Sequence, residues 1–311
     1  LEMAGVTGIV YAIIEEPVRG WTDVQVLGPL LGGAVMIAAF VLWQFRTSAP
    51  LVDLNLFRNR RFALSTVAFT IVGFAMTGVL FVLSPYLQVV QGNDAQGTGI
   101  RLLPLIGAMM AGAITSDWLS RRLGAKVMVS GGMVGISAGM LLLSRAGVDT
   151  GFGLVAIALA VIGLSIALTM IPALDAILSV LPAGETGAGS ALTRAIQNVG
   201  ASLGVAVMGS ILNSAYQAHL VGQLGGFPTA ASAAARTSVA VAAAVARHLP
   251  GTLGDRLLRL AETAYSQGMS DVLMATAGLL LAGAVLMALF LPARTPHAVQ
   301  DAAREAKAVT A

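Results

Sequence analysis

Two charged residues, Asp175 and Arg194, lie within long apolar stretches of a chain that is poor in charge. An ionised group in hydrocarbon costs at least about 2.5 kcal/mol, so such residues rarely face lipid. Each lies six to eight residues from the short 182–186 turn, a depth of roughly 10 Å at about 1.5 Å per residue. Four interpretations follow: a buried ion pair that acts as a structural or gating unit, a wet cavity where Asp175 exchanges a proton or contacts a cation, snorkelling of Arg194 to the interface, or a span boundary drawn too deep.

Further polar residues follow Arg194 on the same stretch. Gln197 and Asn198 continue one helical turn beyond it, and a lipid-facing helix would not keep such a stripe. We therefore favour a lining role in a polar pathway over contacts that only join two helices. A deformable apolar wall could be supplied by other side chains, for each of which ordinary packing is the alternative: Met170, Met208, Phe74, Met76 and Tyr86.

Glycines and prolines recur at informative positions. Gly131, Gly135 and Gly139 place three small residues on one helix face. Gly200 and Gly204 have the same spacing, so both sets of glycines predict close helix packing. Three apolar stretches also contain prolines, which predict either broken helices beside a cavity or tolerated kinks: Pro85, Pro104 and Pro172.

The composition places these residues in a membrane protein. Hydrophobic residues make up 57% of the 311 and charged residues 11%, where a soluble domain carries about 25% charged residues. There is no cysteine and there are three histidines, which argues against a disulfide framework and a metal cluster. Neither a nucleotide-binding loop nor a catalytic constellation occurs, so an enzyme is not expected.

Seven apolar stretches approach the length of about 20 residues that a bilayer requires. Because only continuous helices satisfy the backbone in lipid, we predict an all-α polytopic bundle. A shorter run, 3–14, is interpreted as the second half of a truncated helix. The predicted spans are 24–45, 62–86, 98–116, 127–143, 152–181, 187–212 and 271–291.

Basic residues set the predicted orientation, since Lys and Arg are retained on the cytoplasmic side. Ten lie in one set of connections and tails, against three in the other. The first set is therefore cytoplasmic, as is the C-terminal tail. It comprises Arg46, Arg58, Arg60, Arg61, Arg121, Arg122, Lys126, Arg294, Arg304 and Lys307, and the other comprises Arg19, Arg101 and Arg145.

The long connection 213–270 falls on the external side. Helix-forming residues at 230–247 precede a turn signal at 248–251, and Leu257, Leu258 and Ala261 then follow at helical spacing. We predict a helical hairpin over the outer mouth. The alternative is a disordered polar loop.

Four segments carry a family resemblance. Residues 50–62, PLVDLNLFRNRRF, resemble the cytoplasmic linker of fourteen-span drug:proton antiporters, the EmrB/QacA type within the major facilitator superfamily. Residues 11–21 resemble the outer turn between that family's two extra central helices. The segments 99–104 and 187–211 are similar to the entry of its next core span and to its penultimate helix.

The resemblance implies a domain organisation. Residues 1–45 would be the truncated and complete inserted helices, 46–61 the linker, 62–291 the C-terminal six-helix bundle and 292–311 the cytoplasmic tail. The partner would be an N-terminal six-helix bundle that this sequence lacks. No cofactor is implied except the proton as coupling ion, and no nucleic acid partner is implied.

The loop 117–126 resembles the family's acidic–basic gating loop. Asp117, Arg121, Arg122 and Lys126 are its candidate residues, although Arg121 stands where the family commonly has aspartate. The implied function is proton-coupled export of amphipathic organic compounds from the inner membrane. The alternatives are a narrow-substrate exporter of a metabolite, lipid or antibiotic, and a non-transporting membrane scaffold or regulatory subunit.

Overall fold

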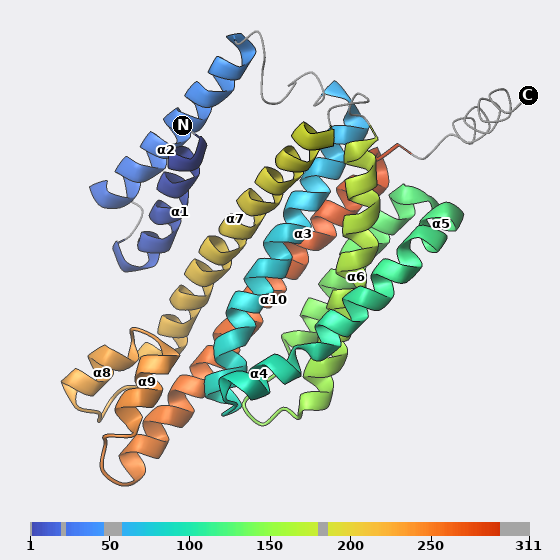
Figure 1. Cartoon of the computed structure of the whole chain (residues 1–311). Helices are drawn as coiled ribbons and strands as arrows, with labels where there is room; N and C mark the ends of the chain where they lie inside the picture. Colours follow the sequence, from blue (N-terminus) through green and yellow to red (C-terminus); the bar gives the residue numbers. More distant parts are fainter. Residues whose placement is uncertain (1, 20–22, 47–57, 180–185, 293–311) are drawn as a thin grey trace, which may run out of the picture.

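The computed structural model describes residues 2–19, 23–46, 58–179 and 186–292. This part of the chain is helical throughout and contains no strand, as predicted (Figure 1). The elements are α1 (Glu2–Arg19), α2 (Val24–Arg46), α3 (Arg60–Pro85), the π-helix η2 (Tyr86–Val90), α4 (Ala95–Arg101), α5 (Leu103–Leu143), α6 (Phe152–Leu178), α7 (Thr186–Val221), α8 (Thr229–Ala235), α9 (Val239–Ala246) and α10 (Thr252–Phe290).

Gly124 turns α5 back on itself. Its φ of 81° and ψ of 154° are accessible to glycine and strained for any other residue. The arms 103–123 and 125–143 therefore run in opposite directions, at the right of Figure 1. Within the described residues, five helices are long and apolar enough to cross a membrane, and the one at 95–143 is folded into two arms at Gly124. These arms correspond to the predicted spans 98–116 and 127–143.

α3 lies between α6 and α7 and packs on both (Figure 1). The α7 side depends on two glycines: a Cβ on Gly200 would overlap the Thr70 carbonyl oxygen, and a Cβ on Gly204 would overlap that of Phe74. The backbones therefore approach closely, as the sequence predicted. By contrast, α6 and α7 barely touch each other.

A second glycine seam joins the 125–143 arm of α5 to α6. A Cβ on Gly135 would meet Ser165, and a Cβ on Gly139 would meet Ile162. The prediction was wrong for Gly131, which faces open space. Gly132, one residue later, packs against Ser165 instead. The shift arises because the spacing of glycines does not reveal which neighbour a helix face meets.

α1 and α2 form a hairpin beside α7 (Figure 1). Gly5 and Gly33 bring the two backbones together. The region 11–21, which resembles an outer turn, is helical as far as Arg19, so α1 is longer than predicted. The connection therefore falls at residues 20–22, which lie outside the described residues, and the Asp23 carboxylate accepts a hydrogen bond of 2.8 Å from the Gln25 N–H at the start of α2.

The predicted connection 213–270 is largely helical and shorter than expected. α7 continues to Val221, and α10 begins at Thr252, 19 residues before Asp271. At about 1.5 Å per residue, the 39 residues of α10 exceed the roughly 30 Å hydrocarbon layer. The predicted turn at 248–251 is confirmed, with Gly251 at φ +60°. We call residues 213–270 the helical cap, and its end of the bundle the cap end.

Two tyrosines fasten the cap to the bundle. Tyr216 and Tyr265 make an edge-to-face contact with ring centroids 6.3 Å apart. The Tyr216 hydroxyl donates to the Ala235 carbonyl at 2.9 Å, and the Tyr265 hydroxyl donates to the Val82 carbonyl at 2.8 Å. Because both hydroxyls are buried and satisfied, the Tyr216 bond fixes α8 to α7 and the Tyr265 bond fixes α10 to α3.

The glycine contact between α3 and α7 can be tested by substitution. Gly204→Ala should lower the free energy of unfolding by about 1–3 kcal/mol, the usual cost of overpacking. Gly131→Ala is the matched control, since no atom lies within 4 Å of the added carbon. Thermal unfolding in detergent measures both variants. Equal stability of the two would contradict the described packing.

Candidate functional site

A polar cavity of about 210 Å³ lies at the end of the bundle that holds Gly124, which we call the Gly124 end. It collects charged groups from three helices that are distant in sequence. Arg61 comes from the start of α3, Asp117 and Arg121 from α5, and Asp175 from the last turn of α6. Ser120, Ala125 and Pro172 complete the lining.

Local structure positions these groups. The Asn59 side chain caps α3 by accepting a hydrogen bond of 3.0 Å from the Arg61 N–H. This cap fixes the start of α3 and therefore the position of Arg61 in its first turn. The Gly124 turn brings both arms of α5 to the same end of the bundle. In α6, buried Pro172 lacks the N–H that would bond the carbonyl four residues earlier. Two arginines and two aspartates thus share one small space.

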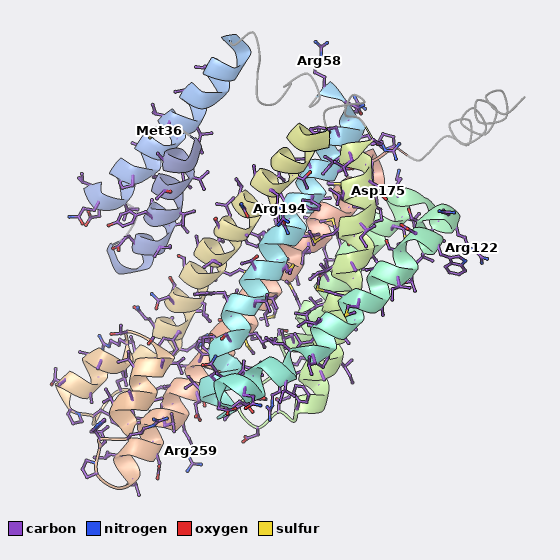
Figure 2. The ribbon with its side chains drawn as sticks, viewed as in Figure 1. Met36, Arg58, Arg122, Asp175, Arg194 and Arg259 are labelled. Carbon is purple, nitrogen blue, oxygen red and sulfur yellow. The ribbon has the colours of Figure 1, made fainter. Side chains whose placement is uncertain are left out.

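The charges of the lining residues balance, because the two arginines match the two aspartates. Of the predicted gating-loop residues, Asp117 and Arg121 line it, whereas Arg122 and Lys126 do not. The Arg122 guanidinium instead stacks 4.2 Å above the Trp118 ring, at the right of Figure 2. The two adjacent arginines therefore have different surroundings.

Asp175 and Arg194 are not brought together. α6 ends at Leu178, three residues before the predicted boundary, so Asp175 lies in its last turn and is exposed. α3 stands between α6, which carries Asp175, and α7, which carries Arg194 (Figure 2). Of the four interpretations, the buried ion pair was wrong because the sequence could not show that α3 intervenes, whereas a span boundary drawn too deep agrees with the end of α6 at Leu178.

The predicted polar stripe of α7 lies on an incompletely covered helix. Arg194 and Asn198 are exposed, while Gln197 is partly buried against Gly73 of α3. In the most apolar part of α7, 28% of residues are buried, against 44–56% in the corresponding parts of the other candidate spans. Because Arg194 cannot lie stably against lipid, this face needs water or protein beside it.

The predicted apolar wall residues have ordinary packing roles. Phe74, Met76 and Met170 are partly buried against the core of the bundle. Tyr86 is fully buried at the cap end. Their contacts are consistent with the alternative weighed for each of them, namely packing.

A polar network around Tyr86 was missed at the level of sequence. The Tyr86 hydroxyl donates to the Gly147 carbonyl at 2.9 Å and accepts a hydrogen bond of 3.1 Å from Gln91. The Gln91 side chain also binds the Thr150 carbonyl at 3.1 Å and accepts a hydrogen bond from Arg101. The Arg101 guanidinium in addition covers the Phe152 ring at 5.1 Å. The available signal was Arg101, one of few basic residues on that side.

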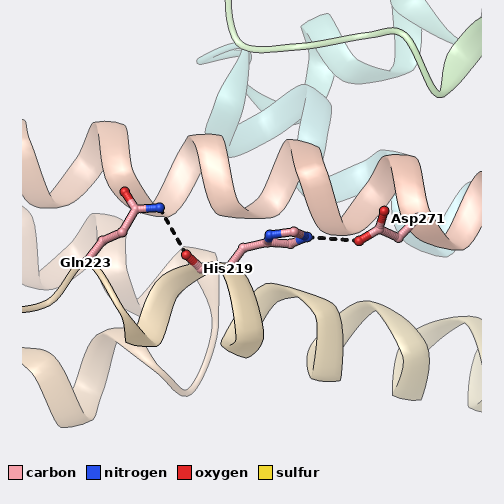
Figure 3. A network of polar contacts seen from close by, with 3 residues as sticks. All are labelled: His219, Gln223 and Asp271. Atoms are coloured by element: carbon pink, nitrogen blue, oxygen red, sulfur yellow. Dashed lines mark hydrogen bonds and ion pairs between the residues drawn. The ribbon is translucent and has the colours of Figure 1, made fainter.

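A second pair missed by sequence reasoning joins α7 to α10. His219 Nε2 lies 2.9 Å from an Asp271 carboxylate oxygen, and Gln223 donates to the His219 carbonyl at 3.1 Å (Figure 3). Both side chains are partly exposed, so the contact stabilises only weakly. In the described part of the chain no group of three metal-ligating side chains occurs.

Comparisons with known proteins identify the fold. The profile of the Major Facilitator Superfamily matches residues 3–205. The tetracenomycin C resistance and export protein of Streptomyces glaucescens is 33% identical over 206 residues, covering 66% of this chain and 38% of the relative. The multidrug resistance protein Stp of Mycobacterium tuberculosis is 34% identical over 212 residues, with coverages of 68% and 39%.

A third relative extends the match. The multidrug efflux pump LfrA of Mycolicibacterium smegmatis is 28% identical over 255 residues, covering 82% of this chain and 50% of the relative. The chain thus spans between about two fifths and one half of the length of these relatives.

The Tyr86 network can be tested by removing one hydroxyl. Tyr86→Phe removes the donor to the Gly147 carbonyl and one of the two acceptors of the Gln91 amide, and should lower the free energy of unfolding by about 1–3 kcal/mol. Tyr11→Phe is the control, because Tyr11 is 44% exposed on α1. Thermal unfolding measures both variants. A loss as large in Tyr11→Phe would show that the network is not the cause.

Proposed function

The chain belongs to the Major Facilitator Superfamily, and from this premise we propose that it is part of a proton-coupled exporter of amphipathic organic compounds. The proposal places it in the inner membrane with the Gly124 end facing the cytoplasm. Two of the relatives are named for multidrug resistance and multidrug efflux, and these names supply the substrate class of the proposal.

The observation that carries the proposal is the exposed polar face of α7. Arg194 and Asn198 are exposed on a membrane-spanning helix, a placement that is unfavourable against lipid. A second helical bundle facing α7 across a wet pathway would cover them. The relatives are about twice the matched length or more, which leaves room for such a bundle. Substrate would pass between the two bundles as they rock.

Charge distribution supports the orientation. Basic side chains gather near the Gly124 end, where the positive-inside rule places the cytoplasm. They are Arg58, Arg60, Arg61, Arg121, Arg122 and Lys126. In this orientation the 210 Å³ cavity is a cytoplasmic gate whose ion pairs exchange between states. The proton is the coupling ion, and no other cofactor is proposed.

A narrow-substrate exporter is the second candidate. One relative is named for resistance to, and export of, a single compound, tetracenomycin C. Arg194 would favour an anionic group on such a substrate. A non-transporting scaffold is the alternative from another class, and the transport assay below separates all three.

The test is transport by the protein encoded by the complete gene, reconstituted in proteoliposomes. We expect an imposed proton gradient to drive movement of several unrelated lipophilic cations, such as ethidium and tetraphenylphosphonium, and a protonophore to abolish it. Movement of a single anionic compound would favour the narrow-substrate exporter. Absence of any proton-driven flux, together with a fixed co-purifying protein, would favour the scaffold.

The two adjacent arginines provide a matched pair for the gate. Arg121→Ala removes a charge from the cavity and should slow transport by a factor of about 5 or more, the size of typical coupling between conformational states. Arg122→Ala removes the stacked arginine outside the lining and should leave the rate within about twofold, as for an exposed surface contact. Rates are normalised to the amount of folded protein. Equal effects would contradict the gate.

A further inference from the structure

A second, larger cavity of about 700 Å³ lies at the cap end, away from the α7 face. It has three walls: the segment 88–94, one face of α9 and one face of α10. Its volume falls within the roughly 300–1,000 Å³ of small-molecule sites. The lining residues are Gln88, Val89, Val90, Gln91, Gly92, Asn93, Asp94, Ala240, Ala243, Ala244, Arg247, Leu258 and Glu262.

The first wall is held in place by its own hydrogen bonds. Gly92 turns the chain at φ +65°, and the Asn93 amide donates to the Leu87 carbonyl at 2.7 Å. Gln91 belongs to the Tyr86 network described above. Asp94 caps α4 by accepting a hydrogen bond of 2.7 Å from the Gly97 N–H. This wall is therefore formed before any ligand arrives, which lowers the entropic cost of binding.

The second wall is made of small side chains. α9 packs Val239, Ala242 and Ala246 into the core and turns Ala240, Ala243 and Ala244 toward the cavity. Larger residues at these three positions would fill the space. Val89 and Leu258 supply apolar surface beside the alanines. The cavity thus offers an apolar floor of the kind that an organic molecule requires.

The charges of the lining favour one sign of ligand. The lining contains two carboxylates, Asp94 and Glu262, and one arginine, Arg247. In the described part of the chain Glu262 makes no ion pair. Arg259, which does not line the cavity, lies near Glu262 and stabilises its charged form. The lining carries one excess negative charge.

We propose that this cavity binds a monovalent organic cation with an apolar body. Its carboxylates would hold the charge, and Val89, Leu258 and the α9 alanines would contact the body. A role in export, as a site outside the membrane that compounds meet at the cap end, rests on the proposed function. Binding itself does not, because it can be measured without transport.

These 311 residues contain no cysteine, so a site-specific test can use the protein encoded by the complete gene in lipid nanodiscs, with any cysteine outside these residues replaced by serine. Ala244→Cys places a lone thiol in the cavity, and Ala233→Cys places one on the exposed face of α8 as control. The rate of labelling by a charged maleimide is measured with increasing tetraphenylphosphonium or tetraphenylborate, which share a shape and differ in charge. We expect tetraphenylphosphonium to protect Ala244→Cys alone, and tetraphenylborate to protect neither.

Two charge variants complete the test in the Ala244→Cys background. Glu262→Gln should raise the half-protecting concentration of tetraphenylphosphonium about fivefold, and Arg247→Gln should lower it by a similar factor, as for a partly solvated charge pair. Opposite shifts cannot arise from general unfolding. Equal protection by tetraphenylborate, protection of the α8 control, or shifts in the same direction would overturn the proposal. Failure of the transport assay would leave it intact.

Discussion

The absence of water in the bilayer core is the constraint on which this architecture depends. Every backbone N–H and C=O must be bonded within its own helix, so the helices can associate only through side-chain packing and close backbone approach. Gly200 and Gly204 on α7, and Gly132 and Gly139 on α5, provide that approach. α3 can then pack against α6, α7 and α10. The positions of the two cavities at the ends of the bundle depend on this helix packing.

The two ends receive different chemistry because the chain turns differently at each. At the Gly124 end the described turn within α5 is tight, and it gathers opposite charges into a small balanced cavity. At the cap end the helices overshoot the hydrocarbon layer, and short helices fill the space between them. The larger cavity arises where the alanine face of α9 fails to fill that space.

Sequence alone predicted the helical class, most spans and the turn at 248–251, because apolar length and turn residues are local signals. It predicted the polar stripe of α7, but it could not predict which helices pack beside that stripe. The pairing of Asp175 with Arg194 failed because adjacency in sequence was taken as adjacency in space, while α3 lies between their helices. The Tyr86 network joins residues about 60 positions apart, and no local pattern marks such contacts.

The unbroken course of α10 has a mechanical consequence. Its 39 residues make a rod of roughly 58 Å at about 1.5 Å per residue. The Tyr265 hydroxyl donates a hydrogen bond to α3 partway along α10, so this contact can act as a pivot. Tyr265 lies 13 residues from Thr252, a lever arm of roughly 20 Å, so each degree of tilt about this contact would displace the cap tip of α10 by about 0.3 Å. Rotation inside the membrane is thereby converted into travel of the cap, without any hinge between them.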